Sequence, residues 1–243
     1  MIRIYHTSDL HDHRGFAARL NALRAEKPGF LFDCGDSLRG SQSVYYRREP
    51  IVAEIDRAGY DAQAIGNREF HYVFGLLAAR ARSMRHPLVC SNLVDLRGRE
   101  LPFVRSLVLA ARNGGTHVHL LGLLVVQYRK GSRWERVFGW RFVDPIETVA
   151  EYAAAMPRSD VLVVLSHIGL RRDEELARAI PRIDLILGGH SHDTLLEPTV
   201  VGAVPIVHAG PYGRYVSATE IEANETGRHA ISKFALLPLL GPP

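Results

Sequence analysis

Short apolar runs that alternate with helical patterns restrict the possible folds of this chain more than any other feature. We expect strands at 2–7, 30–33, 62–65 and 88–91, separated by helices at 16–24, 50–58 and 72–84. The alternation returns later, with helices at 145–155 and 173–179 and strands at 161–166 and 183–187. Strands joined through helices form parallel sheets whose faces the helices cover. The sequence therefore predicts an α/β fold.

Two regions depart from this alternation and are predicted to be β-structure alone. Segments 103–110 and 117–126 flank the sequence ARNGG, whose Asn-Gly pair is a strong signal for a hairpin turn. Near the end of the chain, segments 204–208, 215–223 and 231–237 are typical of a β-meander. No repeat or flexible linker interrupts the 243 residues, so we expect one domain, 1–243, with two sheets flanked by helices.

Composition and charge argue against several classes of protein. The formal net charge is +4, but the basic residues lie in short clusters such as 47–48 and 171–172, which indicates solvated surface and no nucleic-acid partner. The chain begins with MIRIYHTSDLHDH, which lacks an apolar signal segment, and no apolar run approaches membrane-spanning length. Cys34 and Cys90 are expected to be free thiols, and a single disulfide between them stays open as an alternative. We therefore expect a cytoplasmic protein without a membrane partner.

Polar side chains of a similar chemical kind follow five of the predicted strands. They are, in chain order, Asp9, His11, Asp36, Asn67, His167, His190 and His192. Ligands of open α/β sheets bind outside the carboxyl ends of the strands, so these loops are expected to converge on one crevice. Each motif alone is compatible with a helix cap, as at Asp36, or with an ordinary loop. Their joint occurrence directly after apolar strands favours a shared site.

These seven side chains offer oxygen and imidazole ligands without thiolate. Such ligands suit Mn, Fe, Zn, Co or Ni ions, whereas a structural zinc site usually contains cysteine. Cys34 is expected to pack within its strand and not to bind metal. Seven ligands are too many for one ion but suit two ions that share a bridging carboxylate and activate a water. We therefore expect two divalent metal ions, with manganese favoured and magnesium also compatible.

In chain order, the motifs DLH, GDS, GNRE, SHIG and GGHSH resemble those of the calcineurin-like metallophosphoesterase superfamily. In detail they are most similar to the catalytic N-terminal domain of the 5′-nucleotidase family. Segment 144–192 and the stretches GYDAQAIGNREF, PLVCSNL and IVHAGPYGRYV extend this resemblance over nearly the whole chain. The resemblance implies a four-layer α/β/β/α metallophosphoesterase sandwich. It also implies an enzyme that hydrolyses phosphomonoesters, nucleotides or small phosphoanhydrides by means of a metal-activated water.

The same resemblance assigns the individual ligands. It implies that the first metal is bound by Asp9, His11 and His192. It implies that the second is bound by Asn67, His167 and His190, and that Asp36 bridges the two. Three further residues match frequent positions of the family and are expected to hydrogen-bond to ligand histidines or loops, namely Asp12, His13 and Asp173.

Two positions depart from the family motif GNHEFD, which reads GNREFH over residues 66–71 of this chain. In the family, the His of this motif stabilises charge on the transferring phosphoryl group and, helped by the Asp, can protonate the leaving group. Arg68 can still donate hydrogen bonds to a phosphate oxygen, but its guanidinium cannot give up a proton. We hypothesise that Arg68 keeps the electrostatic role and that His71 supplies the proton. The alternative is that Arg68 points away and pairs with a carboxylate such as Glu69.

A second departure concerns length. Full-length nucleotidases of the family carry a C-terminal domain whose aromatic residues stack on the base, and this sequence ends at Pro243, so we expect no nucleotide-specificity domain. A pocket for a small phosphorylated substrate must then come from loops 38–48, 129–141 and 210–214 or from an oligomer partner. Substrate-binding residues are not assigned, and the candidates for contacts to an anion are Arg39, Arg47, Arg129 and Arg214. Two other functions stay open, a non-catalytic metal-binding scaffold and a hydrolase of a sulfur-containing ester.

Overall fold

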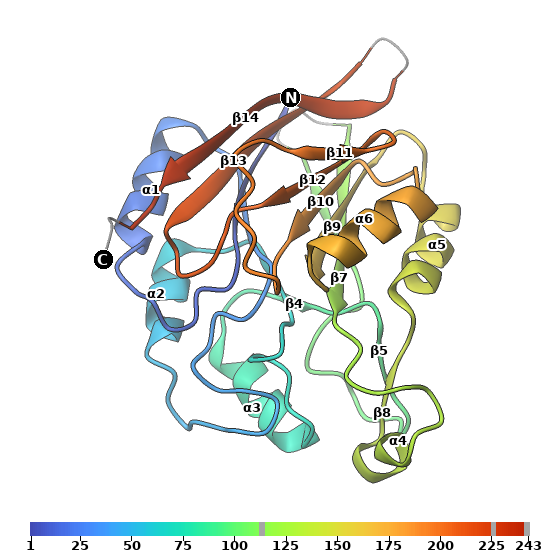
Figure 1. Ribbon diagram of the computed structural model, residues 1–243. Helices are drawn as coiled ribbons and strands as arrows, with labels where there is room; N and C mark the ends of the chain where they lie inside the picture. The colour runs from blue at the N-terminus through green and yellow to red at the C-terminus, as the bar shows by residue number, and fades with distance from the viewer. Residues whose placement is uncertain (112–114, 225–226, 241–243) are drawn as a thin grey trace.

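Two six-stranded sheets lie face to face in the computed structural model, which describes residues 1–111, 115–224 and 227–240 (Figure 1). The first sheet has the order β14 (His229–Pro238), β13 (Tyr215–Ala223), β1 (Ile2–Thr7), β2 (Phe30–Asp33), β3 (Ala62–Ala64), β4 (Leu88–Val89). The second has the order β11 (Thr199–Val201), β12 (Val204–His208), β10 (Leu185–Gly188), β9 (Val161–His167), β7 (His117–Leu124), β6 (Leu107–Ala110).

Helices cover the outer face of each sheet. Those beside the first sheet are α1 (Ala17–Glu26), α2 (Ile51–Ala58) and α3 (Phe74–Ser83), and those beside the second are α5 (Pro145–Ala155) and α6 (Leu170–Ala179). A small sheet of β5 (Leu93–Asp95) and β8 (Trp140–Phe142) lies next to α4 (Arg133–Phe138) at the lower end of the view in Figure 1.

The alternation of side chains along each strand explains the layers. In β9, Val161, Val163 and Leu165 point into the core between the two sheets. Leu162 and Val164 point the other way and pack under α5 and α6. Successive side chains of a strand face opposite sides of the sheet, so a fully apolar strand needs cover on both faces. The predicted four-layer α/β/β/α sandwich is confirmed.

The strand directions bring the functional loops together. In the first sheet β1, β2, β3 and β4 run parallel, and in the second β7, β9, β10 and β12 run parallel. Two hydrogen bonds join loops of one sheet to loops of the other. The backbone nitrogen of His190 donates to the Asp9 carboxylate at 3.1 Å, and His167 Nδ1 donates to the carbonyl oxygen of Cys34 at 2.7 Å. The carboxyl ends of both parallel sets therefore face one common region.

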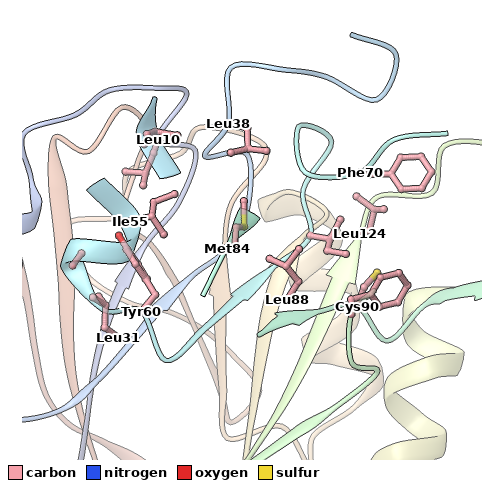
Figure 2. Packing of buried hydrophobic residues seen from close by; sticks show 14 of the residues in the cluster. Leu10, Leu31, Leu38, Ile55, Tyr60, Phe70, Met84, Leu88, Cys90 and Leu124 are labelled. Atoms are coloured by element: carbon pink, nitrogen blue, oxygen red, sulfur yellow. The ribbon is translucent and has the colours of Figure 1, made fainter. Parts of the chain in front are cut away.

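The loops after β1, β2 and β3 and the last residue of β7 each place an apolar side chain in the same core cluster. Leu10, Leu38, Phe70 and Leu124 are essentially inaccessible to solvent and belong to the cluster between the first sheet and its helices (Figure 2). Burial of one such side chain stabilises the fold by about 1.5–3 kcal/mol. The loops are therefore anchored by packing as well as by hydrogen bonds.

Several sequence predictions differ from the structure. The predicted C-terminal meander is wrong, because segment 204–208 pairs with β10 and β11 in the second sheet. Segment 215–223 pairs with β1 in the first sheet, and segment 231–237 pairs with 215–223. The hairpin of β6 and β7 is confirmed in a shorter form, and its predicted Asn-Gly turn lies outside the described residues. The short elements β5, β8, β11 and α4 were not predicted.

The helices and the cysteines bear on two predictions, the absence of a membrane-spanning segment and the presence of free thiols. Within the described residues, none of the helices combines the length and the apolar character needed to cross a membrane. Cys34 and Cys90 are both free and buried, so the free-thiol prediction is confirmed. Cys34 lies directly after β2 and not within the strand, but it is packed between the sheets and donates its thiol hydrogen to the carbonyl oxygen of Leu187 at 3.0 Å.

A buried histidine beside the first sheet makes stability depend on pH. His86 is 9% exposed, and its Nε2 donates to Gln63 Oε1 at 2.8 Å. Burial lowers the pKa of His86 to about 4, against the opposing effect of Asp56. Unfolded histidine titrates near pH 6.5, so the stability from this residue is complete above pH ~6.5 and is lost as the pH falls toward the folded-state value. We expect the titration of His86 to lower the free energy of unfolding of the wild-type protein by about 2 kcal/mol when the pH falls from 8 to 5.

Urea unfolding of H86Q at pH 8 and pH 5 tests this expectation. The variant lacks the titrating ring, so its two free energies of unfolding should differ by about 2 kcal/mol less than those of the wild type. The control is H229Q, because the half-buried ring of His229 makes no hydrogen bond among the described residues. An unchanged pH dependence in H86Q would contradict the assignment.

Candidate metal centre

The structure brings all seven predicted ligands together from loops of both sheets. Ligand atoms of Asp9, His11 and His192 lie within 4.8 Å of one another, and so do those of Asp9, Asp36 and His167. His11 and His192 face each other through their Nε2 atoms at 2.9 Å. Only one of two facing ring nitrogens can supply a hydrogen between neutral imidazoles, so this contact offers at least one lone pair.

Asn67 and His190 complete the cluster. The Nδ2 atom of Asn67 lies 3.4 Å from His190 Nδ1, and the rings of His190 and His167 are 5.0 Å apart. Asp9, and not Asp36, belongs to both groups of ligand atoms. The assignment of Asp36 as the bridging ligand therefore stays a prediction.

The loops adopt unusual backbone conformations at these residues. The predicted ligands with positive φ are Asp9, His11, Asp36, His190 and His192. Two glycines leave space for this arrangement, since a Cβ on Gly35 would lie 2.6 Å from the nitrogen of Gly66, and one on Gly66 would lie 2.4 Å from the nitrogen of Asp36. Positive φ is costly for residues other than glycine and persists where the surroundings enforce it, often at functional sites.

Glu69 joins the loop after β2 to the loop after β3. Its buried carboxylate accepts hydrogen bonds from the backbone nitrogens of Asp36 at 2.7 Å, Ser37 at 2.9 Å and Gly66 at 3.0 Å. Burial raises the pKa of Glu69, while the backbone donors favour its charged form. The sequence identified Glu69 only as part of the family motif, and the structure gives it the role of positioning two ligand loops.

One ring nitrogen of His167 is held by a hydrogen bond, and the other faces the carboxylates of the cluster. Its Nδ1 donates to the Cys34 carbonyl oxygen, and its Nε2 faces Asp36 Oδ1, 3.3 Å away. This Nε2 is buried and has no hydrogen-bond partner. Burial alone would lower the pKa of His167, but Asp36, Asp9 and Glu69 raise it to about 10. Without an ion, a proton on His167 offsets the neighbouring carboxylates, and with an ion the same atom can serve as a ligand.

Two other histidines of the cluster, His11 and His190, stay neutral near pH 7, as metal ligands require. Burial, helped by the charge of Arg68, lowers the pKa of His11 to about 4. Burial, helped by His167, lowers the pKa of His190 to about 4. His167 lowers the pKa of the Asp36 carboxyl well below its usual range, despite burial. The residues present therefore fit divalent ions.

Arg68 lies at the edge of this cluster. Its Nη1 donates to the carbonyl oxygens of Arg39 at 3.0 Å and Leu38 at 3.4 Å, and its Nε lies 4.0 Å from Asp36 Oδ2. The side chain is 34% exposed, and its Nη2 makes no hydrogen bond among the described residues. The alternative pairing with Glu69 is wrong, because that carboxylate is buried on backbone donors. The guanidinium lies instead beside Asp36, and its role toward an anion stays a prediction.

His71 lies in a different setting. Its ring is buried, its Nδ1 accepts a hydrogen bond from the backbone nitrogen of Val73 at 3.0 Å, and its edge packs on Tyr45. No hydrogen bond or ring contact within the described ranges joins His71 to the predicted ligands. The structure thus gives it a role at the start of α3, and its role as a proton donor stays a prediction.

The remaining polar predictions have structural roles. His13 Nδ1 bonds the carbonyl oxygen of Leu10 at 3.0 Å, so it stabilises its loop as expected. The buried Oδ1 of Asp12 has no hydrogen-bond partner among the described residues and lies 3.8 Å from Arg14 Nε, so the role of the Asp12 side chain stays a prediction. Asp173 bonds Ser166 and His208, and not a predicted ligand histidine. Gln127, which the sequence did not single out, donates from Nε2 to Asn67 Oδ1 at 3.1 Å. A neutral amide after a strand gave no signal by which to find it.

The four arginines predicted as anion contacts, Arg39, Arg47, Arg129 and Arg214, are all exposed, and the guanidinium of Arg214 lies 5.8 Å from the ring of Tyr212. A hollow of about 650 Å³ lies at the opposite ends of β9 and β10, where Arg182 and Arg228 bond backbone carbonyls. That hollow is therefore separate from the predicted ligands.

The chain is similar to known proteins over nearly its whole length. The family model of calcineurin-like phosphoesterases matches residues 2–194. The uncharacterised metallophosphoesterase YunD of Bacillus subtilis is 30% identical over an alignment of 247 residues, which covers 96% of this chain and 53% of YunD. The 5′-nucleotidase of Mus musculus is 25% identical, with 93% of this chain and 47% of that protein covered.

The crystal structure of a 5′-nucleotidase precursor from Thermus thermophilus superposes with a TM-score of 0.82 at 26% identity. The match covers 98% of this chain and 54% of that chain. This chain therefore spans about half the length of these relatives.

Proposed function

The chain belongs to the calcineurin-like phosphoesterase family, and we propose that it is a hydrolase of small phosphorylated compounds that uses two divalent metal ions. The observation that carries this proposal is the convergence of carboxylate and imidazole atoms on two groups that share Asp9. Seven oxygen and nitrogen ligands without thiolate suit two ions with positions left open for a substrate.

We assign the ligands to two adjacent positions. The first ion would be held by Asp9, His11 and His192, the second by Asn67, His167 and His190, with Asp36 between them. When bound, such ions polarise phosphoryl oxygens and activate water at neutral pH. Manganese is the proposed metal, since hard oxygen ligands and imidazole together suit it.

The residues of the chain have distinct parts in the reaction. Arg68, held by the carbonyl oxygens of Arg39 and Leu38, would direct its free Nη2 at the phosphoryl group and stabilise the negative charge that develops there. Its guanidinium keeps its protons, so it cannot protonate a leaving group. The site should therefore favour leaving groups that depart without a proton, such as aryl oxides and the phosphate of an anhydride.

We propose phosphomonoesters, nucleotides or small phosphoanhydrides as the substrate class. The name of the 5′-nucleotidase relatives supports nucleotides, but no residue here is assigned to the base. We further propose that residues 1–243 act as a single domain, in a cytoplasmic setting that keeps Cys34 and Cys90 reduced.

Metal analysis and a substrate panel test the proposed function. Protein loaded with Mn²⁺ and passed through a desalting column should retain two ions per chain. It should hydrolyse p-nitrophenyl phosphate and a nucleotide faster than bis-p-nitrophenyl phosphate, and a chelator should remove this activity until Mn²⁺ is added back. Bound metal without turnover of any substrate would favour a scaffold, and a preference for the bis-ester would contradict the monoesterase assignment.

A further inference from the structure

Tyr212 has a positive φ, as do most of the predicted metal ligands. Among the described residues, seven other than glycine have positive φ, and six of them are predicted ligands or the neighbouring Asp12. The seventh is Tyr212, with φ 65°, in the loop between β12 and β13. For a bulky side chain this conformation is costly and persists only where its surroundings enforce it.

The ring of Tyr212 packs against histidines of one half of the centre. Its centroid lies 5.6 Å from that of His11, 5.6 Å from that of His192 and 4.8 Å from that of His13. The backbone nitrogen of Tyr212 also donates to the carbonyl oxygen of Asp9 at 2.8 Å. Tyr212 therefore contacts all three residues assigned to the first ion.

The loop that carries this ring is itself fixed. The backbone nitrogens of Leu239 and Leu240 donate to the carbonyl oxygens of Arg214 at 2.9 Å and Gly213 at 3.0 Å. A Cβ on Gly213 would lie 3.2 Å from the side chain of Leu240 and 3.4 Å from that of Leu10. The main chain on the C-terminal side of Tyr212 is thus closely packed, which holds the ring in one place.

The ring of His167 is oriented by a hydrogen bond that the histidines assigned to the first ion lack. A metal-binding histidine usually donates its other ring nitrogen to a carboxylate or carbonyl oxygen, which fixes the ring. His167 does so through Cys34, but Nδ1 of His11 is buried and has no hydrogen-bond partner. Among the described residues, His192 Nε2 hydrogen-bonds to His11 and lies 3.6 Å from Asp9 Oδ1. The Tyr212 ring occupies the position from which packing can replace the missing hydrogen bonds.

We propose that Tyr212 is a positioning residue that holds the imidazoles of His11 and His192 in place for the first ion. This inference rests on the proposed two-ion centre. Loss of the ring should weaken the site of Asp9, His11 and His192 and leave the site of Asn67, His167 and His190 unchanged. Residues that only orient ligands cost about 10–100-fold in metal affinity when they are replaced.

Calorimetric titration of metal-stripped protein with Mn²⁺ tests this proposal, with three variants. Y212F keeps the ring, Y212N keeps a residue that tolerates positive φ but lacks the ring, and Y212G removes both ring and strain. We expect Y212F to match the wild type. Y212N and Y212G should each weaken one of the two sites by about 10–100-fold. The control is W134N, which removes an exposed aromatic ring from α4.

The outcomes separate the inference from the proposed function. Wild-type protein without Mn²⁺ binding would overturn both. Wild-type binding of two ions with unchanged binding in Y212N and Y212G would overturn the role of Tyr212 alone. Equal weakening of both sites would also overturn it, because that indicates a general loss of structure, which the melting temperatures of the metal-free variants would report. A defect in Y212F as large as in Y212N would overturn the role of the ring.

Discussion

Replacement of Arg68 by alanine is expected to lower kcat for p-nitrophenyl phosphate by about 10²–10³-fold, the usual cost of losing one donor at a developing negative charge. The guanidinium lies at the edge of the ligand cluster with Nη2 free, so the loss should appear in kcat more than in metal content. Steady-state kinetics together with metal analysis of R68A would measure both. The surface variant R171A, in which an exposed arginine of α6 is removed, is the control.

The R68H variant separates charge from proton transfer. An imidazole can donate a proton to a leaving oxygen, and general acid catalysis contributes about 10²–10⁴-fold where the leaving group needs it. We therefore expect R68H to increase turnover of a nucleoside monophosphate, whose alkoxide is a poor leaving group, relative to its turnover of p-nitrophenyl phosphate. Equal activity of the wild type, R68A and R68H on both substrates would show that Arg68 takes no part in the reaction.

Replacement of Asp36 by asparagine is expected to lower activity by more than about 100-fold. Even residues that only orient ligands cost about 10–100-fold, and Asp36 contacts His167 directly and accepts the backbone hydrogen bond of Arg68 at 2.8 Å. The amide removes the negative charge that offsets bound cations, so retained Mn²⁺ should fall as well. Activity and metal content of D36N would be measured beside D56N, whose partly exposed side chain pairs with Arg85 elsewhere. Full retention of two ions in D36N would contradict its assignment between them.

The strand bounds could be predicted where local pattern decides them. Segments 2–7, 30–33, 204–208 and 215–223 coincide with β1, β2, β12 and β13, since each is an apolar or alternating run with clear limits. The sheet to which β12 belongs could not be predicted, because it depends on pairing with β10 and not on the sequence of β12 itself. Short elements such as α4 carry too few residues for a periodic pattern.

The candidate centre was more predictable than the elements around it. Aspartate and histidine carry a chemical signature after a strand, and these six residues lie together in the structure with Asn67, which belongs to the motif GNRE. Tyr212 and Gln127 carry none, because a phenol and an amide are common in any loop. Only the spatial contacts with His11 and Asn67 identify them. The setting of His71 likewise depends on the start of α3, which lies two residues later than the predicted helix.

The position of the centre between two sheets has a consequence for the whole molecule. Asp9, His11, Asp36 and Asn67 follow strands of the first sheet, whereas His167, His190 and His192 follow strands of the second. Each proposed ion would therefore act as a reversible cross-link between the two halves of the sandwich. Folding and ion binding would then be parts of one equilibrium, in which free metal at about 100 times the dissociation constant adds about 2.7 kcal/mol per site. The supply of metal would thus set how tightly the two halves are held together, as well as whether the centre can react.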